Sequence, residues 1–203
     1  MAFAPGGRSA YIATDTFGEF RQLARVDLAT MKYDVLTAKL PWNVTDIVVE
    51  PELGLVAFAT NEDGASGLYL LVGRTHRRIK LPLGIVSALE FSPDGTQVGF
   101  TLSRPDAPSD AYSVRLPDGK LTRWTQSEVG GLDEESFVVP ERIRYTTFDD
   151  RSIPAYVFRP PGASRTKKVP VLIHIHGGPE SQYRPRFSST DQFYLNELGL
   201  AVI

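Results

Sequence analysis

The sequence predicts an all-β part followed by an α/β part. Over the first 125 residues, short apolar strands recur with spacings of 46 and 42 residues, and this repeat stops after Thr125. From residue 169 onward a continuous apolar run, a helical pattern and a second apolar run follow one another. The 203 residues suffice for one large or two small domains, and the change of pattern favours two.

The composition is that of an ordinary globular protein, with 42% hydrophobic and 23% charged residues. A net charge of −2 gives no electrostatic reason to expect nucleic acid or an anionic membrane as partner. Cysteine is absent, which excludes disulfides and thiolate chemistry. No run reaches the ~18 apolar residues of a membrane helix, and residues 1–8 lack the pattern of a signal peptide. We therefore expect a cytoplasmic protein with no nucleic-acid and no membrane partner.

The repeat becomes visible when Pro5, Pro51 and Pro93 are superposed. Each proline lies in a turn that precedes an alternating strand. The three strands are Ala10-Tyr11-Ile12, Val56-Ala57-Phe58 and Val98-Gly99-Phe100. The same frame places a valine 21 positions after each proline, at Val26, Val72 and Val114.

Each repeat closes with a second hairpin. The strands of these hairpins are expected over 23–26 and 32–36, 68–72 and 77–81, and 113–116 and 121–125. In the third hairpin, Asp118-Gly119 supplies the positive φ that a tight turn needs. Four short strands in about 40 to 45 residues form a unit the size of one β-propeller blade. A β-sandwich is the alternative, but it does not predict that each repeat has a valine 21 residues after its proline.

Three blades do not close a ring, because propellers have four or more. We therefore expect the N-terminal part of the propeller to be missing from this chain. The turn Ser92-Pro93-Asp94-Gly95 also resembles the turn that opens a blade in propellers of the prolyl oligopeptidase and TolB types.

The repeat is followed by a polar segment over 126–136, which contains Gly130-Gly131 and is typical of a linker. A hairpin is expected next, with strands over 142–147 and 154–158 around an acidic turn. Its second turn residue is Asp150, where glycine would fit most easily, and aspartate tolerates positive φ better than most residues.

The last 35 residues have the pattern of a βαβ unit. The run 169–175 has no polar face, so we expect a strand buried on both sides of a parallel sheet. Residues 188–190 are expected to cap a helix that begins near Asp191 and ends at Gly199. Its apolar stripe would comprise Phe193, Tyr194, Leu195 and Leu198. A second apolar strand starts at Leu200, and a domain that stopped there would expose an unpaired edge.

The segment His176-Gly177-Gly178-Pro179 at the end of the first of these strands carries the chemical signal. Acyl transfer from an ester or amide places negative charge on the carbonyl oxygen, and losing one hydrogen-bond donor to that oxygen costs ~3 kcal/mol in measured cases. Paired glycines leave such N–H groups free of side chains. A His-Gly-Gly turn has this role after the third strand of lipases and esterases.

Residues 169–185, together with the hairpin strand 153–157 and the closing segment 197–203, resemble serine peptidases of the prolyl oligopeptidase family. The tetrapeptide His-Gly-Gly-Pro is that of the acylaminoacyl-peptidase and dipeptidyl-aminopeptidase-like members. The resemblance implies that residues 1–130 are the C-terminal blades of a β-propeller. It also implies that residues 131–203 are a linker and the N-terminal portion of an α/β-hydrolase domain, both domains being incomplete.

The resemblance further implies that Gly178 offers a main-chain N–H to the oxyanion, while Gly177 and His176 shape the loop. The nucleophile is expected downstream in a Gly-x-Ser-x-Gly elbow, followed by the aspartate and the histidine of the triad. No serine of the chain has glycine both two residues before and two residues after it, and His174 and His176 precede any such elbow. We therefore expect a peptidase fragment that is inactive alone, with oligopeptides as the substrate of the whole enzyme.

Two other functions remain open, a propeller-bearing esterase and a non-enzymatic TolB-like interaction module. No cofactor and no metal are expected, because Asp133, Glu134 and Glu135 lack ligand spacing with a histidine. The remaining residues of interest receive mostly structural interpretations. We interpret His174 as a packed core histidine, His76 as solvent-exposed, Trp42 and Trp124 as blade packing, and Glu19 and Glu62 as ordinary loop acids. Glu180 is either a surface residue or one that orients the loop or contacts substrate.

Overall fold

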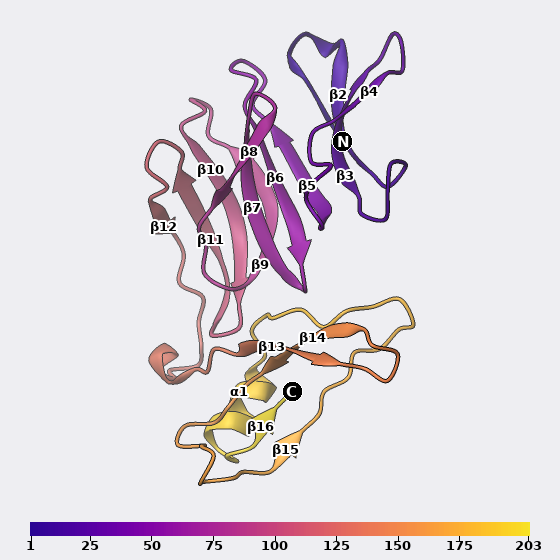
Figure 1. Cartoon of the computed structure of the whole chain (residues 1–203). Helices are drawn as coiled ribbons and strands as arrows, with labels where there is room; N and C mark the ends of the chain where they lie inside the picture. Colours follow the sequence, from indigo (N-terminus) through magenta and orange to yellow (C-terminus); the bar gives the residue numbers. More distant parts are fainter. The chain divides into compact units, whose positions relative to one another are not determined.

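The computed structural model describes residues 1–203 and consists mainly of β-strands, with one short α-helix (Figure 1). The chain divides into two compact units. The first comprises residues 1–82, 86–102 and 110–126, and the second comprises residues 83–85, 103–109 and 127–203.

Three four-stranded sheets follow one another along the first 123 residues, each with its strands in sequence order. The first contains β1 (Ala2–Phe3), β2 (Ser9–Thr14), β3 (Gln22–Asp27) and β4 (Tyr33–Val35), with a 3₁₀ turn at Pro5–Gly7. The second contains β5 (Asn43–Val49), β6 (Val56–Glu62), β7 (Ala65–Val72) and β8 (Thr75–Ile79). The third contains β9 (Ile85–Phe91), β10 (Gln97–Arg104), β11 (Ala107–Arg115) and β12 (Leu121–Arg123).

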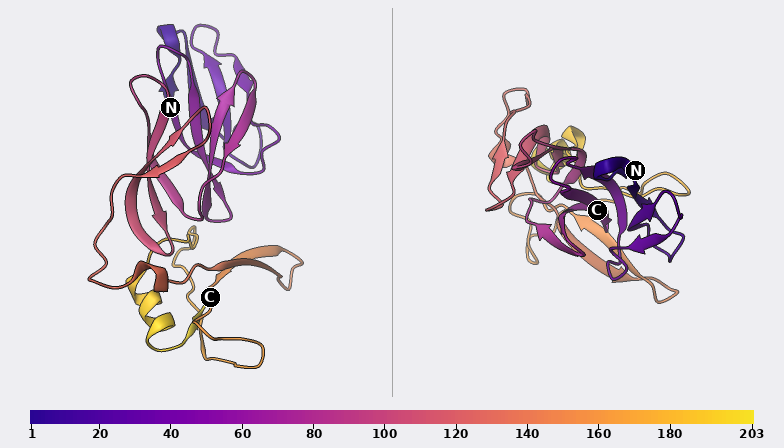
Figure 2. Two further views of the ribbon diagram at one scale, coloured as in Figure 1. Left: turned by 90° about the vertical axis from the view of Figure 1, so that its left-hand side faces the viewer. Right: turned by 90° about the horizontal axis from the view of Figure 1, so that it is seen from above.

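The first unit is held together by two apolar clusters, one on each side of the second sheet. Figure 2 shows the ribbons of the sheets from two further directions. Side chains on a strand alternate between its two faces, and β6 follows this rule. Val56 and Phe58 belong to the cluster shared with Leu23 of the first sheet, whereas Ala57 and Ala59 belong to the cluster shared with Phe100 of the third. The middle sheet is therefore buried on both faces, which explains the nearly continuous apolar sequence of β6 and β7.

The three predicted closing hairpins are confirmed, because β3 pairs with β4, β7 with β8, and β11 with β12 in antiparallel fashion. The predicted offset of 21 residues is wrong in the second repeat. There Val72 is 56% exposed, and Leu71 takes the buried position that Val26 and Val114 occupy in the other repeats. The tight turn at Asp63 between β6 and β7 shortens that repeat by one residue, so that Val56 pairs with Leu71.

The second unit contains a 3₁₀ turn at Glu134–Ser136 and two small sheets. One is the antiparallel hairpin of β13 (Glu141–Thr146) and β14 (Ser152–Val157). The other is the parallel pair of β15 (Val171–Leu172) and β16 (Ala201–Val202), connected through helix α1 (Ser189–Asn196). The strand, helix and parallel strand expected from the sequence are thus present.

Local sequence signals fix two details of this unit. Asp150 has a φ of 59° in the turn between β13 and β14, which confirms the left-handed conformation expected there. The Ser188 hydroxyl accepts a hydrogen bond from the main-chain N–H of Asp191 at 3.1 Å, so Ser188 is the N-cap of α1. Gly199, with a φ of 63°, lies just beyond the end of the helix as expected.

Two predictions about burial are wrong in the second unit. Only Leu195 of the expected apolar stripe is fully buried, in a cluster with Tyr156, Phe158 and Val202, while Phe193 and Leu198 are half exposed. The run 169–175 was expected to be buried on both sides, yet Ile173 and Ile175 are 67% and 80% exposed. One partner strand and one eight-residue helix do not supply enough surface to cover both faces of β15.

Candidate functional site

The candidate site is the loop that follows β15. The main-chain N–H of His174 still donates to the carbonyl of Ile203 at 2.7 Å, so the backbone runs beside β16 up to His174. From Ile175 the chain leaves the sheet, and every residue from 171 to 182 is exposed. The His-Gly-Gly-Pro segment therefore lies at the carboxyl end of a strand in a parallel pair, the position where α/β sheets bind ligands.

The two glycines of the loop differ in their surroundings. The main-chain N–H groups of Gly177 and Gly178 donate no hydrogen bond, and His176 Nδ1 lies 2.8 Å from the carbonyl oxygen of Gly177. Neither glycine has a positive φ, so backbone conformation does not demand glycine here. A Cβ at Gly177 would meet open space, whereas a Cβ at Gly178 would lie 3.2 Å from the main-chain nitrogen of Glu180. Gly178 is thus the more tightly packed of the two glycines, and a side chain there would require the backbone at Glu180 to shift by a few tenths of an ångström.

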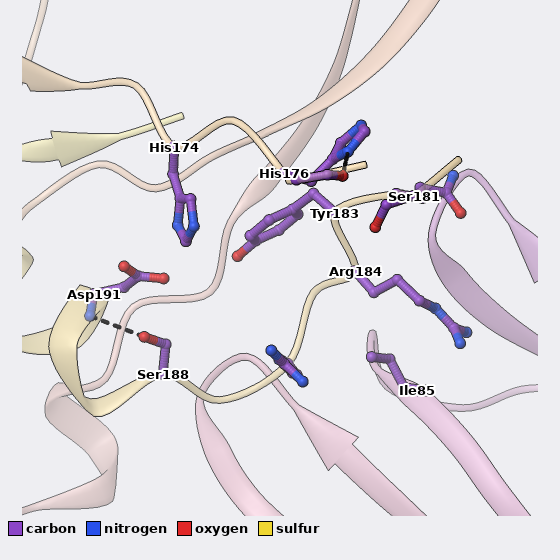
Figure 3. Close-up of a pocket in the computed structure, with 11 residues that line it drawn as sticks. Ile85, His174, His176, Ser181, Tyr183, Arg184, Ser188 and Asp191 are labelled. Atoms are coloured by element: carbon purple, nitrogen blue, oxygen red, sulfur yellow. Dashed lines mark hydrogen bonds between the residues drawn. The ribbon is translucent and has the colours of Figure 1, made fainter. Parts of the chain in front are cut away.

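A cavity of about 610 Å³ opens beside this loop (Figure 3). His174, His176 and Gly177 line it from the loop, Tyr183 from the segment that follows, and Asp191 from the first turn of α1. The edge of the His174 ring faces Tyr183, with 5.8 Å between the ring centroids. The cavity is thus lined by the glycine-containing loop, by the acidic side chain of Asp191 and by the aromatic side chain of Tyr183.

Burial and charge shift the titration of two side chains in this cavity. Burial, reinforced by the negative charge of Asp191, raises the pKa of the Tyr183 hydroxyl to about 12. Tyr183 is therefore a hydrogen-bond donor at neutral pH. Burial lowers the pKa of the Arg184 guanidinium from its usual value.

Asp191 lines the cavity with an acidic side chain, and the sequence pattern did not identify it as a site residue. It is only 5% exposed, yet its carboxylate makes no hydrogen bond and no ion pair. An aspartate in the first turn after Ser188 has the pattern of a helix-capping residue, which accounts for its sequence without any ligand. Its burial and the direction of its side chain depend on tertiary packing, so no local signal identifies it.

Some of the predicted site residues line the cavity and others do not. His176 and Gly177 line the cavity, while Gly178 lies in the same loop beside it. The interpretation of His174 as a core histidine is wrong, because it is exposed and lines the cavity. His174 follows β15, and because no element covers the faces of this part of the chain, its side chain is not packed in a core. Glu180 is exposed and does not line the cavity.

Residues of the first unit also require corrections. Trp124 is largely exposed, its indole N–H donating to Ser113 Oγ at 2.9 Å, so it is not blade packing. His76 is half-buried, with its ring edge against Phe58 and Tyr69, because β8 lies beside β7. Glu62 is buried rather than an ordinary loop acid.

No group of three or more His, Asp or Glu side chains is placed so that it would hold a metal ion. The helix α1 has eight residues, and no helix in the structure combines the length and apolarity needed to span a membrane.

Sequence comparison finds peptidases as relatives, although no family model matches the chain. The chain is 26% identical over 123 residues to the uncharacterized peptidase YuxL of Bacillus subtilis, covering 60% of this chain and 19% of that protein. It is 24% identical over 183 residues to dipeptidyl-peptidase 5 of Porphyromonas gingivalis, covering 88% of this chain and 27% of that protein. The chain therefore spans about a fifth to a quarter of the length of these relatives.

Comparison of folds gives the same picture. A solved structure from work on two prolyl endopeptidases superposes with a TM-score of 0.77 at 18% identity, covering 96% of this chain and 29% of that one. At this identity the match shows a common fold. Together the comparisons show that the sequence relatives of this chain are peptidases and that its fold is shared with a structure from work on prolyl endopeptidases.

Proposed function

We propose that this chain forms part of a serine peptidase that hydrolyses oligopeptides. In this proposal residues 1–130 are propeller blades, and residues 131–203 are a linker and the first portion of an α/β-hydrolase domain. The three consecutive four-stranded sheets and the parallel pair β15–β16 support the division. The peptidase names of the sequence relatives support the activity.

The free main-chain N–H groups at the tip of β15 carry the mechanistic proposal. When a serine hydroxyl attacks a peptide carbonyl, the carbonyl oxygen becomes an oxyanion that needs preorganised donors. Gly178 N–H, which has no acceptor within the chain, would donate to that oxygen. Gly177 and His176 would hold the loop in shape, with the imidazole of His176 against the Gly177 carbonyl.

The other catalytic groups would come from a further segment of the polypeptide. A serine in a Gly-x-Ser-x-Gly elbow would attack, a histidine would take its proton and deliver it to the leaving amine, and an aspartate would orient that histidine. No such elbow occurs in residues 1–203, so the proposal expects these residues alone to show no turnover.

The contrast between the two glycines provides the test. In the longer polypeptide, Gly178→Ala should lower kcat for a peptide amide by about tenfold to a hundredfold, because crowding against Glu180 displaces the donor by a fraction of an ångström. Gly177→Ala is the matched control and should stay within about threefold of wild type, since its Cβ meets open space. Steady-state kinetics would measure both variants.

Three outcomes would contradict the proposal. The oxyanion role fails if Gly178→Ala is as active as Gly177→Ala. The serine mechanism fails if a fluorophosphonate probe labels no serine of the longer polypeptide. The peptidase assignment gives way to an esterase if p-nitrophenyl esters are turned over while aminoacyl and peptidyl amides are not.

A further inference from the structure

We propose that the cavity between helix α1 and the segment that leads into β13 binds a small organic cation, with its positive charge carried on an apolar, ring-containing body. This cavity is separate from the one beside the His-Gly-Gly-Pro loop, because the two share no lining residue. The inference goes beyond the proposed peptidase function and does not rest on it.

The lining of this second cavity is largely aromatic. Its volume is about 320 Å³, which lies within the size range of small-molecule sites. Phe137 and Phe187 line it as a contacting pair, with 5.2 Å between the ring centroids. Phe193 on α1 and Leu132 also line it and are 51% and 62% exposed. Apolar side chains that stay accessible around a hollow are available to a ligand.

One wall of the cavity is fixed by the side-chain amide of Gln192, which is 4% exposed. Its oxygen accepts a hydrogen bond from the main-chain N–H of Val138 at 2.8 Å, and its nitrogen donates to the carbonyls of Val138 at 3.0 Å and Pro105 at 3.1 Å. Asn196, one turn later on α1, donates to the same amide oxygen at 3.3 Å. These bonds hold α1 against residues 128–138, so the cavity is formed before a ligand arrives.

The charge around the cavity is negative. Glu128 and Glu197 line it, and no lysine, arginine or histidine does. The two stretches that supply the lining, 127–137 and 187–197, contain four and two acidic residues and no basic one. The whole chain has 24 acidic and 22 basic residues, so this imbalance is local. A hollow lined by charges of one sign concentrates ligands of the opposite sign.

Glu197 occupies a position that normally favours a cation. It is the C-cap of α1, whose last turn contains no basic residue. The C-terminal end of a helix carries partial negative charge, which a carboxylate there increases and a cation offsets. Across the cavity, Glu128 accepts hydrogen bonds from the main-chain N–H groups of Gly130 and Gly131 at 2.8 and 3.2 Å, which orient its carboxylate. A cation in the cavity would therefore gain from both carboxylates and from the helix end.

Rings and carboxylates together define the class of ligand. A cation is attracted both to the face of an aromatic ring and to a carboxylate, whereas a neutral apolar molecule gains only from the rings and an anion is repelled. Both glutamates are exposed, so their main contribution is selectivity for positive charge rather than a large gain in affinity.

Three probes of one ring size test the proposal on the wild-type 203-residue chain. Benzyltrimethylammonium should bind at least about tenfold tighter than benzyl alcohol, which is neutral, and phenylacetate, an anion, should not bind measurably. The NMR resonances of Phe137, Phe187 and Phe193 should shift on addition of the cation. Raising the NaCl concentration from about 0.05 to 0.5 M should weaken cation binding at least about threefold. Equal affinity for all three probes, no binding of the cation, or shifts confined to other residues would overturn the proposal.

Three variants separate the contribution of charge from that of the ring. Glu197→Gln should weaken binding of benzyltrimethylammonium about threefold to tenfold and leave benzyl alcohol within about twofold. Glu135→Gln is the matched control, because it removes an exposed acid of the same region that does not line the cavity, and should leave both probes within about twofold. Phe193→Leu keeps apolar bulk but removes the ring, so the cation should lose more affinity than the alcohol. Equal effects of Glu197→Gln and Glu135→Gln would overturn the assignment to this cavity.

The longer polypeptide provides the last measurement, and the same preference for the cation is expected there. Binding by the 203-residue chain but not by the longer polypeptide would mean that a further segment covers the cavity, and the ligand site would then be wrong for the whole protein. Because binding alone is measured, a failure of the proposed peptidase activity would leave this result unchanged.

Discussion

At the scale of single residues, Glu62 and Gly67 form an interdependent pair. The buried Glu62 carboxylate accepts hydrogen bonds from Thr60 Oγ1 at 3.0 Å, from the Tyr69 hydroxyl at 2.7 Å and from Arg78 Nη2 at 2.7 Å. A Cβ at Gly67 would lie 2.0 Å from Glu62 Oε1. The glycine is therefore needed for the space that the carboxylate fills, not for its backbone conformation.

Gly67→Ala should lower the free energy of unfolding by about 2 kcal/mol, because the added methyl group expels Glu62 from its hydrogen bonds. Urea denaturation would measure the loss. In a Glu62→Ala background the same substitution should cost at least about 1 kcal/mol less, since the nearest clashing group is gone and only the Thr60 hydroxyl, 2.7 Å from the added Cβ, still crowds it. An equal cost in both backgrounds would show that Glu62 is not the group displaced.

Two of the eight tyrosines should titrate late. Burial raises the pKa of both Tyr69 and Tyr183 to about 12, with the hydrogen bond to Glu62 adding to the effect at Tyr69. Because these values exceed the ordinary pKa near 10, the protonated phenols stabilise the fold below pH 10, and this contribution is lost as the pH rises through 12.

Ultraviolet absorbance of tyrosinate would follow this titration. Tyr69→Phe and Tyr183→Phe should each remove part of the late phase, while the phase near pH 10 stays the same. A titration in which all tyrosines of the native chain ionise together near pH 10 would contradict both assignments.

At the scale of single elements, the β11–β12 hairpin contains one buried and one exposed ion pair. Asp110 is fully buried at its side chain and pairs with Arg123 Nη2 at 2.6 Å, also accepting from Thr125 Oγ1 at 2.6 Å. Asp118 in the turn pairs with Arg115, and both of these side chains are about half exposed. The hairpin thus offers a comparison of two aspartates on one element.

Asp110→Ala should lower the free energy of unfolding by about 2 to 3 kcal/mol, because it leaves the partly buried Arg123 without its carboxylate. Asp118→Ala should have a much smaller effect, since solvent screens an exposed pair. Chemical denaturation of both variants would measure the difference. Equal losses of unfolding free energy would show that the buried ion pair stabilises this hairpin no more than the exposed one.

Elements defined by local rules could be predicted from the sequence. The turn at Asp150, the cap at Ser188 and the three closing hairpins each depend on a few neighbouring residues with known turn or capping preferences. The position of the His-Gly-Gly-Pro loop at the end of a parallel strand could also be predicted, since β15 and its glycines are adjacent in the chain.

Features that depend on distant contacts could not be predicted. The exposure of His174 follows from the number of strands that pair with β15, and the exchange of Leu71 for Val72 follows from the length of one turn. The burial of Asp191 follows from how α1 packs, and an aspartate near a helix start is equally typical of an exposed cap. These outcomes depend on tertiary packing rather than on local propensity.

At the scale of the whole molecule, apolar side chains on β15 and in the loop after it remain uncovered. Ile175 is 80% exposed, whereas Leu195 on α1 is 1% exposed. In the 203-residue chain, Ile175→Lys should change the free energy of unfolding by less than about 0.5 kcal/mol and should reduce aggregation. Leu195→Lys should cost more than about 3 kcal/mol, because it buries a charge in the core of the second unit.

Thermal denaturation and light scattering would test this pair of variants. A loss of stability in Ile175→Lys comparable to that in Leu195→Lys would mean that the side chain is covered in solution. In that case the uncovered face described for β15 would be wrong.

The pairing of β15 with β16 has a consequence for the order in which the chain is made. Val171 meets Ala201, which follows 30 residues later in the sequence. At about 5 to 20 residues per second, translation delivers the second strand roughly 1.5 to 6 seconds after the first. During that interval the apolar, β-branched residues of β15 have left the ribosome but have no partner strand. This segment is therefore a candidate binding site for a chaperone that recognises nascent chains.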